Sequence, residues 1–260
     1  WGEQPKTSPN LIKLNTNENP YPPSPNVIRA LQTLDTEGLR TYPNPLADEL
    51  RAEVAKLNRI ADENVVITNG GDEGLRLSLT TFVDPGETVC FADPSYSLYP
   101  VLAAIQGANI KPVAYSDGWE IPETFPEKIK SFNAKMSYLV NPHAPSGNFY
   151  SLGALDNIAQ SAPGVLLIDE AYADFIDPSL NYQSADLLKK YDNVLILRTF
   201  SKGYSLAGIR LGYLMGNEAL ISPIISKTRD SYNVGSIQQR LGTAAITDQE
   251  YSQKIWKKIR

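Results

Sequence analysis

The sequence contains a single cysteine and a single histidine among its 260 residues. With Cys90 alone, the chain can form neither an internal disulfide nor a cysteine-cluster metal site. With His143 alone, it cannot build a metal centre from several histidines, and a Ser-His-Asp catalytic group would have to use His143. We therefore expect no bound metal, and we expect any chemistry to rest mainly on lysine, tyrosine, aspartate, asparagine and arginine.

The sequence also lacks an excess of positive charge and any long apolar run. Its formal net charge is −5, which disfavours a nucleic-acid partner because no basic stretch would neutralise phosphates. The longest apolar runs, such as residues 165–168, fall far short of the roughly 20 residues that a membrane-spanning helix needs. No charged segment followed by an apolar one stands at the N-terminus, so we expect a cytoplasmic protein that does not bind membranes.

The sequence does contain a regular alternation of short apolar runs and helix-length segments. Strands are expected over residues 65–68, 88–91, 110–115, 137–140, 165–168, 194–197 and 208–215. Helices are expected over residues 27–34, 46–57, 72–82, 96–106, 152–160, 185–191, 236–247 and 249–260. Several strands show no polar–apolar alternation, which indicates a sheet buried on both faces. The pattern predicts an α/β fold, a three-layer α/β/α sandwich around a mainly parallel seven-stranded sheet.

Composition divides the chain into three parts. Residues 1–45 are rich in proline and asparagine and predict an extended N-terminal arm. Residues 46–247 would form the large α/β domain. Residues 248–260 include the basic amphipathic segment YSQKIWKKIR. This segment either docks as a terminal helix or begins a further domain of a longer protein.

Two motifs follow early strands, where ligands bind in an open parallel sheet. In TNGGDEG, residues 68–74, two glycines would let the backbone approach a ligand, and the free N–H groups of the next helix would receive a phosphate. The alternative is an ordinary turn with Asp72 as the N-cap. In ADPSYSLYP, residues 92–100, Tyr96 would either stack on a planar ring or pack in the core.

The motif VLLIDEAYADF, residues 165–175, places Asp169 at the end of a buried strand. A carboxylate there is costly unless it meets a cation or a hydrogen-bond donor. Asp169 could pair with a protonated ring nitrogen and make an aromatic ring a better electron acceptor. The alternatives are a helix cap or a magnesium ligand.

The stretch LRTFSKGYSLAGIRLGY, residues 197–213, places Lys202 in a turn after an apolar run. A lysine that is desolvated beside cations can attack a carbonyl and form a Schiff base. Thr199, Ser201 and Arg210 carry hydroxyl and guanidinium groups that suit a phosphate. The alternative for Lys202 is a solvated surface side chain.

Seven motifs, taken in order, resemble those of the fold-type I aminotransferases of class I/II. They are LNTNENPYPPSP, RTYPNP, TNGGDEGL, DPSYSLY, NPHAPSG, IDEAYADF and RTFSKGYSLAGIRLGY. Within that group the chain is most similar to the histidinol-phosphate aminotransferases. The resemblance spans essentially the whole sequence. It implies the large domain of a pyridoxal-phosphate-dependent transferase, with pyridoxal 5′-phosphate as cofactor. The implied reaction moves an amino group between L-histidinol phosphate, the amino donor, and 2-oxoglutarate, the 2-oxo acid acceptor, in histidine biosynthesis.

The resemblance also implies a role for each matching residue. Lys202 would bind the cofactor covalently and move a proton, Asp169 would pair with the ring nitrogen, and Tyr172 would donate to the 3-oxygen of the ring. Tyr96 would stack on that ring. The implied phosphate ligands are Gly71, Asp72, Glu73, Thr199, Ser201, Arg210 and, from the second subunit of a homodimer, Tyr42. The implied substrate contacts on the arm are Tyr21 and Asn17.

The sequence departs from the family pattern at two places. Ala144 stands where the family carries an asparagine that binds the 3-oxygen, so Tyr172 would act alone or with His143, Asn141 or a water. Relatives also continue into a small C-terminal domain, apparently missing here, that supplies an arginine for the substrate carboxyl group. Arg229 is an available cation, but nothing in the sequence assigns it that role.

These departures leave two alternatives to the histidinol-phosphate reaction. One keeps the cofactor and changes the reaction, since threonine-phosphate decarboxylases and other amino-acid aminotransferases share the motifs. The other is a truncated domain that binds pyridoxal phosphate without turnover.

Overall fold

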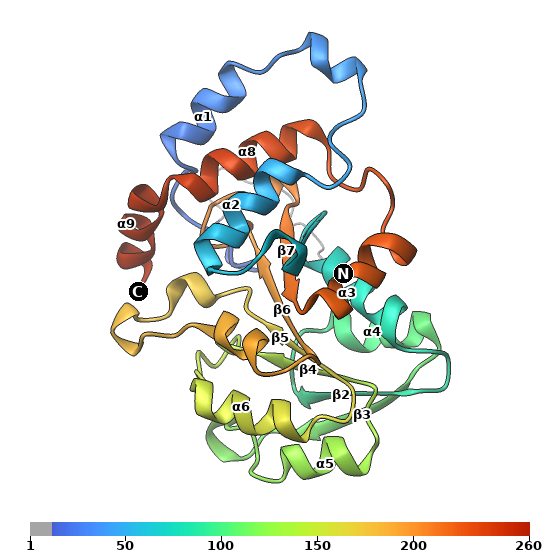
Figure 1. Ribbon diagram of the computed structural model, residues 1–260. Coiled ribbons are helices and arrows are strands. Elements are labelled where there is room, and N and C mark those ends of the chain that lie inside the picture. The colour runs from blue at the N-terminus through green and yellow to red at the C-terminus, as the bar shows by residue number, and fades with distance from the viewer. Residues whose placement is uncertain (1–11) are drawn as a thin grey trace.

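The computed structural model describes residues 12–260, and its centre is a seven-stranded sheet (Figure 1). The strands are β1 (Val65–Thr68), β2 (Thr88–Asp93), β3 (Asn109–Ala114), β4 (Met136–Val140), β5 (Val165–Asp169), β6 (Val194–Thr199) and β7 (Gly212–Gly216). They lie in the order β1-β7-β6-β5-β4-β2-β3. β7 pairs antiparallel with β1 and β6, and the other neighbouring pairs are parallel. The predicted sheet is confirmed.

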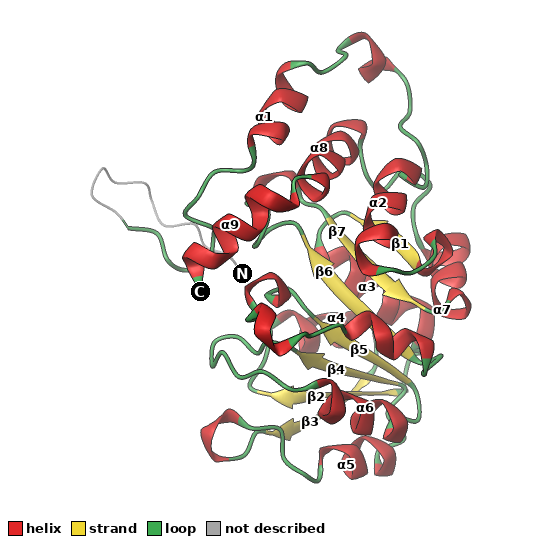
Figure 2. Cartoon of the chain, turned by 60° about the vertical axis from the view of Figure 1, so that its left-hand side comes forward, coloured by secondary structure: helices red, strands yellow, loops and turns green. Residues whose placement is uncertain are grey.

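Helices cover both faces of this sheet (Figure 2). They are α1 (Pro25–Gln32), α2 (Asp48–Asn58), α3 (Gly71–Phe82), α4 (Leu98–Gln106), α5 (Phe125–Ser131), α6 (Leu152–Ser161), α7 (Glu218–Pro223), α8 (Ser236–Thr247) and α9 (Gln249–Ile259). One buried cluster of side chains joins the sheet to α2, α5, α6 and α8. A second joins it to α3, α4 and α7. The arrangement is the predicted α/β/α sandwich.

Strand β5 shows why the sequence forms such a sheet. Leu166 and Ile168 lie in one buried cluster, whereas Leu167 between them lies in the other. Because both faces of the strand are covered, every position is apolar and no alternation with polar residues is seen. The first polar side chain along this strand is Asp169, at its carboxyl end. Because β2, β4, β5 and β6 are parallel, the turns that follow them lie at the same edge of the sheet.

Several predicted elements begin at other residues than in the structure, and two of these shifts involve predicted site residues. The strand predicted over residues 208–215 begins at Gly212, because Ala207–Ile209 forms a short 3-10 helix and Arg210 has a left-handed backbone with φ of 52°. The helix predicted to open at Tyr96 begins at Leu98, so Tyr96 lies in the preceding turn.

Other differences concern short helices. The segment predicted as a helix over residues 185–191 is a 3-10 helix over Ser184–Lys189. The sequence analysis did not identify α5 and α7, which have seven and six residues and each contain a proline. Elements this short show too few turns for a helical repeat of apolar residues to stand out.

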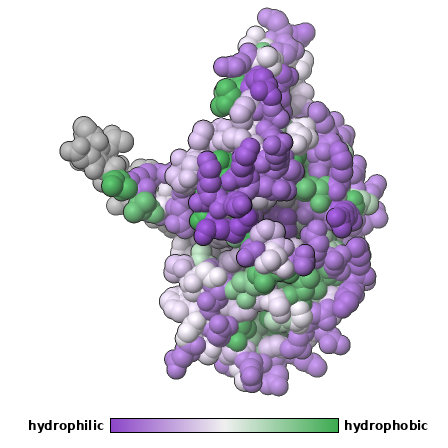
Figure 3. Space-filling model, turned by 90° about the vertical axis from the view of Figure 1, so that its left-hand side faces the viewer, coloured by the Kyte–Doolittle hydropathy of each residue, from purple (hydrophilic) through white to green (hydrophobic). Residues whose placement is uncertain are grey.

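The last described helix, α9, packs against the turns that follow β5 and β6. The indole Nε1 of Trp256 donates a hydrogen bond to the carbonyl of Gly203, 2.9 Å away, and Arg260 donates to the carbonyl of Ile176 at 3.1 Å. A groove of about 770 Å³ runs beside α9 and is lined in part by Asp174, Arg198 and Trp256. Hydrophilic residues predominate on this side of the molecule (Figure 3). No helix within residues 12–260 is long and apolar enough to cross a bilayer.

Glycine at position 212 brings the turn between β1 and α3 close to β7. A Cβ atom on Gly212 would lie 2.9 Å from the backbone carbon of Gly70 and 2.9 Å from the backbone nitrogen of Gly71. Backbone atoms in a packed sheet cannot move aside as a flexible side chain can. Gly212 therefore sets the position of the turn that carries the first predicted ligand motif.

We predict that Gly212→Ala lowers the free energy of unfolding by about 1–3 kcal/mol, the usual cost of overpacking. Gly208→Ala is the matched control, because a Cβ atom there meets no atom within 4 Å. Urea unfolding of both variants beside the parent chain measures the difference. Equal stability of the two variants would contradict the close approach at Gly212.

Candidate active site

Asp169 ends β5 with its side chain buried, 5% exposed. One carboxylate oxygen, Oδ2, accepts a hydrogen bond of 2.7 Å from the hydroxyl of Tyr99. The other, Oδ1, accepts one of 3.1 Å from the backbone N–H of Ala171. Burial raises the pKa of Asp169 to about 6, while these two donors act in the opposite direction. No ion pair of Asp169 occurs within residues 12–260. Each of its oxygens accepts one hydrogen bond here, so each still has a lone pair for a further donor.

Lys202 lies in the turn after β6, and its backbone is held from two sides. Asn19 of the N-terminal arm donates a side-chain hydrogen bond of 2.9 Å to the carbonyl of Lys202. The indole of Trp256 binds the next carbonyl, that of Gly203. The half-buried side chain turns into the fold, and its Nζ lies 5.8 Å from the centre of the Tyr172 ring.

The amine of Lys202 is hydrogen-bonded to the N-terminal arm. Nζ donates hydrogen bonds to the carbonyls of Thr16, at 2.7 Å, and Asn17, at 3.2 Å. The Asn17 side chain in turn donates to the hydroxyl of Tyr172 at 2.9 Å. Burial lowers the pKa of Lys202, and the nearby Arg210 charge acts in the same direction. The predicted residues Lys202, Tyr172 and Asn17 thus come together.

The guanidinium of Arg210 forms hydrogen bonds and an ion pair beside the turn that carries Lys202. Its Nη1 donates to Ser201 Oγ at 3.3 Å, and Thr199 Oγ1 donates to the same oxygen at 3.0 Å. Its Nη2 forms an ion pair of 3.2 Å with Asp72. A Cβ atom at Gly70, where φ is +81°, would lie 2.7 Å from that Nη2. Glycine at position 70 therefore leaves the space that the guanidinium uses.

The start of α3 lies against this group. The helix begins at Gly71 with Gly70 before it, so the alternative interpretation of Asp72 as an N-cap is wrong. Asp72 instead accepts hydrogen bonds from Arg210 and from the Tyr96 hydroxyl, the latter at 3.1 Å. The Glu73 carboxylate accepts from the backbone N–H of Asn69 at 2.6 Å and so braces the turn. Among the side chains at the start of α3, Asp72 is therefore the one that contacts Arg210.

Tyr96 connects this group to Asp169 through a second tyrosine. Its ring stands perpendicular to the ring of Tyr99, with centroids 5.8 Å apart, and it is 43% exposed. Tyr99 is fully buried and donates to Asp169, as described above. Tyr99 was not predicted as a site residue, although it lies three residues after Tyr96 in the same motif. Contacts therefore run from Arg210 through Asp72, Tyr96 and Tyr99 to Asp169.

Two predicted residues lie apart from this group. Tyr42 is 80% exposed and stacks on Tyr232, with centroids 4.5 Å apart and an angle of 17° between the rings. Tyr21 lies beside α9, where the ammonium of Lys258 is 5.2 Å from the centre of its ring. Neither position contradicts the predicted roles, because Tyr42 was expected to act on a second subunit and Tyr21 on a bound substrate.

The loop that carries Ala144 is built around His143. The histidine is 1% exposed, with Nδ1 2.8 Å from Ser146 Oγ and Nε2 3.2 Å from the carbonyl of Pro94. Burial lowers its pKa. The side-chain amide of Asn141 donates to Tyr150 and Tyr182. Both polar side chains are therefore engaged within the fold.

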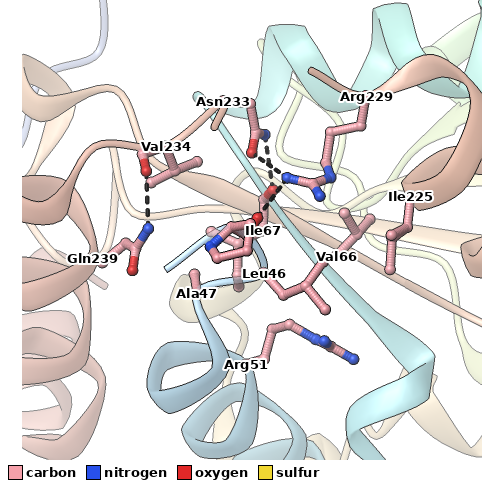
Figure 4. Close-up of a pocket in the computed structure, with 11 residues that line it drawn as sticks. Leu46, Ala47, Arg51, Val66, Ile67, Ile225, Arg229, Asn233, Val234 and Gln239 are labelled. Carbon is pink, nitrogen blue, oxygen red and sulfur yellow. Dashed lines mark hydrogen bonds between the residues drawn. The ribbon is translucent and has the colours of Figure 1, made fainter. Parts of the chain in front are cut away.

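Arg229, the cation without an assigned role, is also engaged within the fold. Its Nη1 donates to the carbonyl of Pro45 at 2.7 Å and to Asn233 Oδ1 at 2.9 Å (Figure 4). These groups border a small cavity of about 10 Å³ that Arg51 and Val66 also line. Asn233 also donates to Glu73. Arg229 and Asn233 therefore help to hold the carboxylate that accepts from Asn69 in the turn before α3.

Comparison with known proteins identifies the family of this chain. The family model "Aminotransferase class I and II" matches residues 9–260. The chain is 41% identical over 261 residues to a histidinol-phosphate aminotransferase of Rippkaea orientalis and 42% identical over 261 residues to one of Microcystis aeruginosa. Each alignment covers 100% of this chain and 71% of the relative.

Solved structures give the same result for the fold. A histidinol-phosphate aminotransferase of Sinorhizobium meliloti, solved with pyridoxal 5′-phosphate, superimposes with a TM-score of 0.88 at 27% identity. The superposition covers 94% of this chain and 66% of that chain, so the present chain spans just under two thirds of its length. An aspartate aminotransferase of Thermus thermophilus, 22% identical with a TM-score of 0.80, shares the fold.

The raised pKa of Asp169 predicts a specific dependence of stability on pH. Between pH 4 and 6 the folded chain binds a proton at Asp169 that the unfolded chain releases, so this contribution to stability is present at low pH and is lost as the pH rises. Asp169→Asn should flatten this part of the profile by about 2–3 kcal/mol. Urea unfolding from pH 4 to 7 measures it, with Asp186→Asn, an exposed carboxylate, as control. Parallel profiles for parent and Asp169→Asn would contradict the prediction.

Proposed function

The chain belongs to the class I and II aminotransferases, and on this premise we propose that it forms the cofactor-binding part of an enzyme that moves an amino group between L-histidinol phosphate and 2-oxoglutarate. One observation carries the proposal: the half-buried amine of Lys202 lies beside Tyr172 in the turn that also joins Ser201 to Arg210. The names of the curated relatives support histidinol phosphate as the substrate. The acceptor 2-oxoglutarate rests on the family resemblance, and the cytoplasmic location stays a prediction.

The cofactor is pyridoxal 5′-phosphate, and the residues present fit its groups. It carries an aldehyde, a ring nitrogen, a 3-oxygen and a phosphate. The site offers an amine with a lowered pKa, a buried carboxylate, a tyrosine hydroxyl, and a guanidinium with two hydroxyls beside a helix start. When bound, the cofactor supplies an aldehyde and an aromatic ring that accepts electrons.

We assign the central roles to three residues. Lys202 would present its amine to the aldehyde and would later hold and return the proton of the substrate Cα, and burial lowers the pKa of this amine, which favours its neutral form. Asp169 would accept a hydrogen bond from the ring nitrogen through its remaining lone pairs. Tyr172 would donate to the 3-oxygen, for which Ala144 has no polar side chain to offer.

The phosphate would be held by Arg210 together with the hydroxyls of Ser201 and Thr199 and the N–H groups at the start of α3. A guanidinium and a helix N-terminus both favour a bound phosphate. Gly71, Asp72 and Glu73 would contribute through their backbone N–H groups. The Asp72 carboxylate now pairs with Arg210, so a bound phosphate would have to share that cation.

The remaining roles concern the ring and the substrate. Tyr96 offers a half-exposed ring on which the cofactor would stack. Asn17 and Tyr21, on the predicted arm of residues 1–45, would contact the substrate. The boundaries at residues 46–247 and 248–260 remain part of the same prediction.

The Lys202 assignment predicts a covalent adduct. Pyridoxal phosphate followed by borohydride should add one cofactor mass to the parent chain, and peptide mapping should place it on Lys202. Lys202→Ala should lose the adduct, whereas Lys227→Ala, which removes an exposed lysine, should keep it. An adduct of equal yield in Lys202→Ala would refute the assignment.

Amino transfer to 2-oxoglutarate is the expected activity, and carbon dioxide release from an O-phosphorylated amino acid would instead favour a decarboxylase.

Tyr42 supports a homodimer in which each site uses both chains. Its ring is exposed and is fixed by stacking on Tyr232, itself 47% exposed. Leu39, immediately before the RTYPNP motif, is 46% exposed. Exposed apolar side chains grouped in this way are typical of protein–protein contacts. We propose that Tyr42 of the partner subunit reaches the phosphate site of each chain.

Complementation tests this arrangement. Tyr42→Ala and Lys202→Ala should each be strongly impaired in binding or using the cofactor, for different reasons. Mixing the two chains creates heterodimers in which one site has an intact Lys202 and an intact Tyr42 from the other chain. Partial recovery of the borohydride adduct in the mixture is expected, with each variant alone as control. A sedimentation profile of monomers only would contradict the dimer.

A further inference from the structure

We infer that Tyr99 is a positioning residue for Asp169: its hydroxyl keeps the carboxylate ionised and turned so that its remaining lone pairs stay open to a further donor. The inference rests on the proposed function, in which Asp169 accepts the ring N–H of the cofactor. Neither the sequence motifs nor the family resemblance assigned Tyr99 a role.

The carboxylate is held at two points. Tyr99, on α4, donates to Oδ2 at 2.7 Å, and the backbone N–H of Ala171 donates to Oδ1 at 3.1 Å. One donor on each oxygen fixes the rotation of the carboxylate plane. Each oxygen has about two acceptor positions, so each can accept one further hydrogen bond. Without the Tyr99 hydroxyl, the backbone donor alone would hold the group.

The tyrosine itself is held in place by other rings. Its ring stacks on that of Tyr138, with centroids 4.6 Å apart and 6° between the planes. The ring of Tyr96 stands perpendicular to it at 5.8 Å, and Phe91 lies at 5.9 Å. A fully buried ring with neighbours on several sides cannot rotate its hydroxyl away. The residue expected to stack on the cofactor and the residue expected to bind its nitrogen are therefore fixed relative to each other through Tyr99.

The electrostatic surroundings make this donor necessary. Burial favours the neutral form of Asp169, and the nearby carboxylates of Asp72, on α3, and Glu170, after β5, act in the same direction. The Tyr99 hydroxyl and the Ala171 N–H oppose them. Burial also raises the pKa of Tyr99 itself well above its usual range, so the hydroxyl stays a donor throughout the pH range of interest. Tyr96 and Tyr138, whose rings contact Tyr99, likewise have raised pKa values and stay neutral.

The chain offers a matched control for removing this hydroxyl. Tyr138 is stacked on Tyr99 and equally buried, but the donors to Asp169 in the described part of the chain are Tyr99 and Ala171, not Tyr138. Tyr99→Phe and Tyr138→Phe therefore delete the same atom from the same aromatic stack. The first alone removes a donor to Asp169.

The first experiment follows the Asp169 carboxyl carbon by NMR titration of the cofactor-free chain. Tyr99→Phe should raise the titration midpoint by about one to two pH units. This shift corresponds to the free energy lost when a hydrogen bond to a charged group is removed. Tyr138→Phe should leave the midpoint unchanged. An unchanged midpoint in Tyr99→Phe, or equal shifts in both variants, would overturn the inference.

The second experiment measures the dissociation constant of pyridoxal phosphate at pH 7 and above. Tyr99→Phe should weaken binding about two- to tenfold at pH 7, and the difference should shrink as the pH rises, because Asp169 then ionises in both chains. In an Asp169→Asn background, Tyr99→Phe should have no further effect. An equal loss in that background would show a packing effect and overturn the inference. Failure of the parent chain to bind the cofactor would instead count against the proposed function, since the titration of Asp169 needs no cofactor.

Discussion

A carboxylate buried at the end of a central strand is the constraint on which the site depends. Asp169 cannot be moved toward water without breaking β5, because its neighbours in register on β4 and β6 are buried apolar residues. A charge in that position needs donors, and the chain supplies them from α4 and from its own next turn. A ring nitrogen that carries a proton would be one more donor to the same group. The buried carboxylate at this edge of the sheet, an acceptor, therefore suits the protonated ring nitrogen of the cofactor, a donor.

The sequence was sufficient to predict the sheet and to name several residues that the structure brings together, whose roles stay predictions. Residues of the strands belong to two buried clusters, and the resulting apolar runs identified all seven. The strand ends were harder, because the left-handed backbone at Arg210 cannot be read from residue type. Arg210 itself lies among the residues that the motifs predicted. Its contact with Asp72 joins two motifs that are separated by more than a hundred residues.

The contacts that hold the functional side chains in place were not predictable in the same way. Tyr99 acts on a residue 70 positions away, and Asn19 acts on one 183 positions away. A local pattern shows which side chains could carry chemistry, because that depends on residue type. It does not show which distant donor meets a given carbonyl or carboxylate, because that depends on how strands and helices are ordered in space. Trp256 is another such case, since its indole binds Gly203.

The turn that carries Lys202 is held by segments near the two ends of the described chain, Asn19 on one side and Trp256 on the other. During synthesis on the ribosome, the lysine emerges more than fifty residues before the tryptophan that completes its support. Until α9 docks, one of the two contacts that hold this turn is missing. The support of the lysine turn therefore depends on a helix that is translated well after the turn itself.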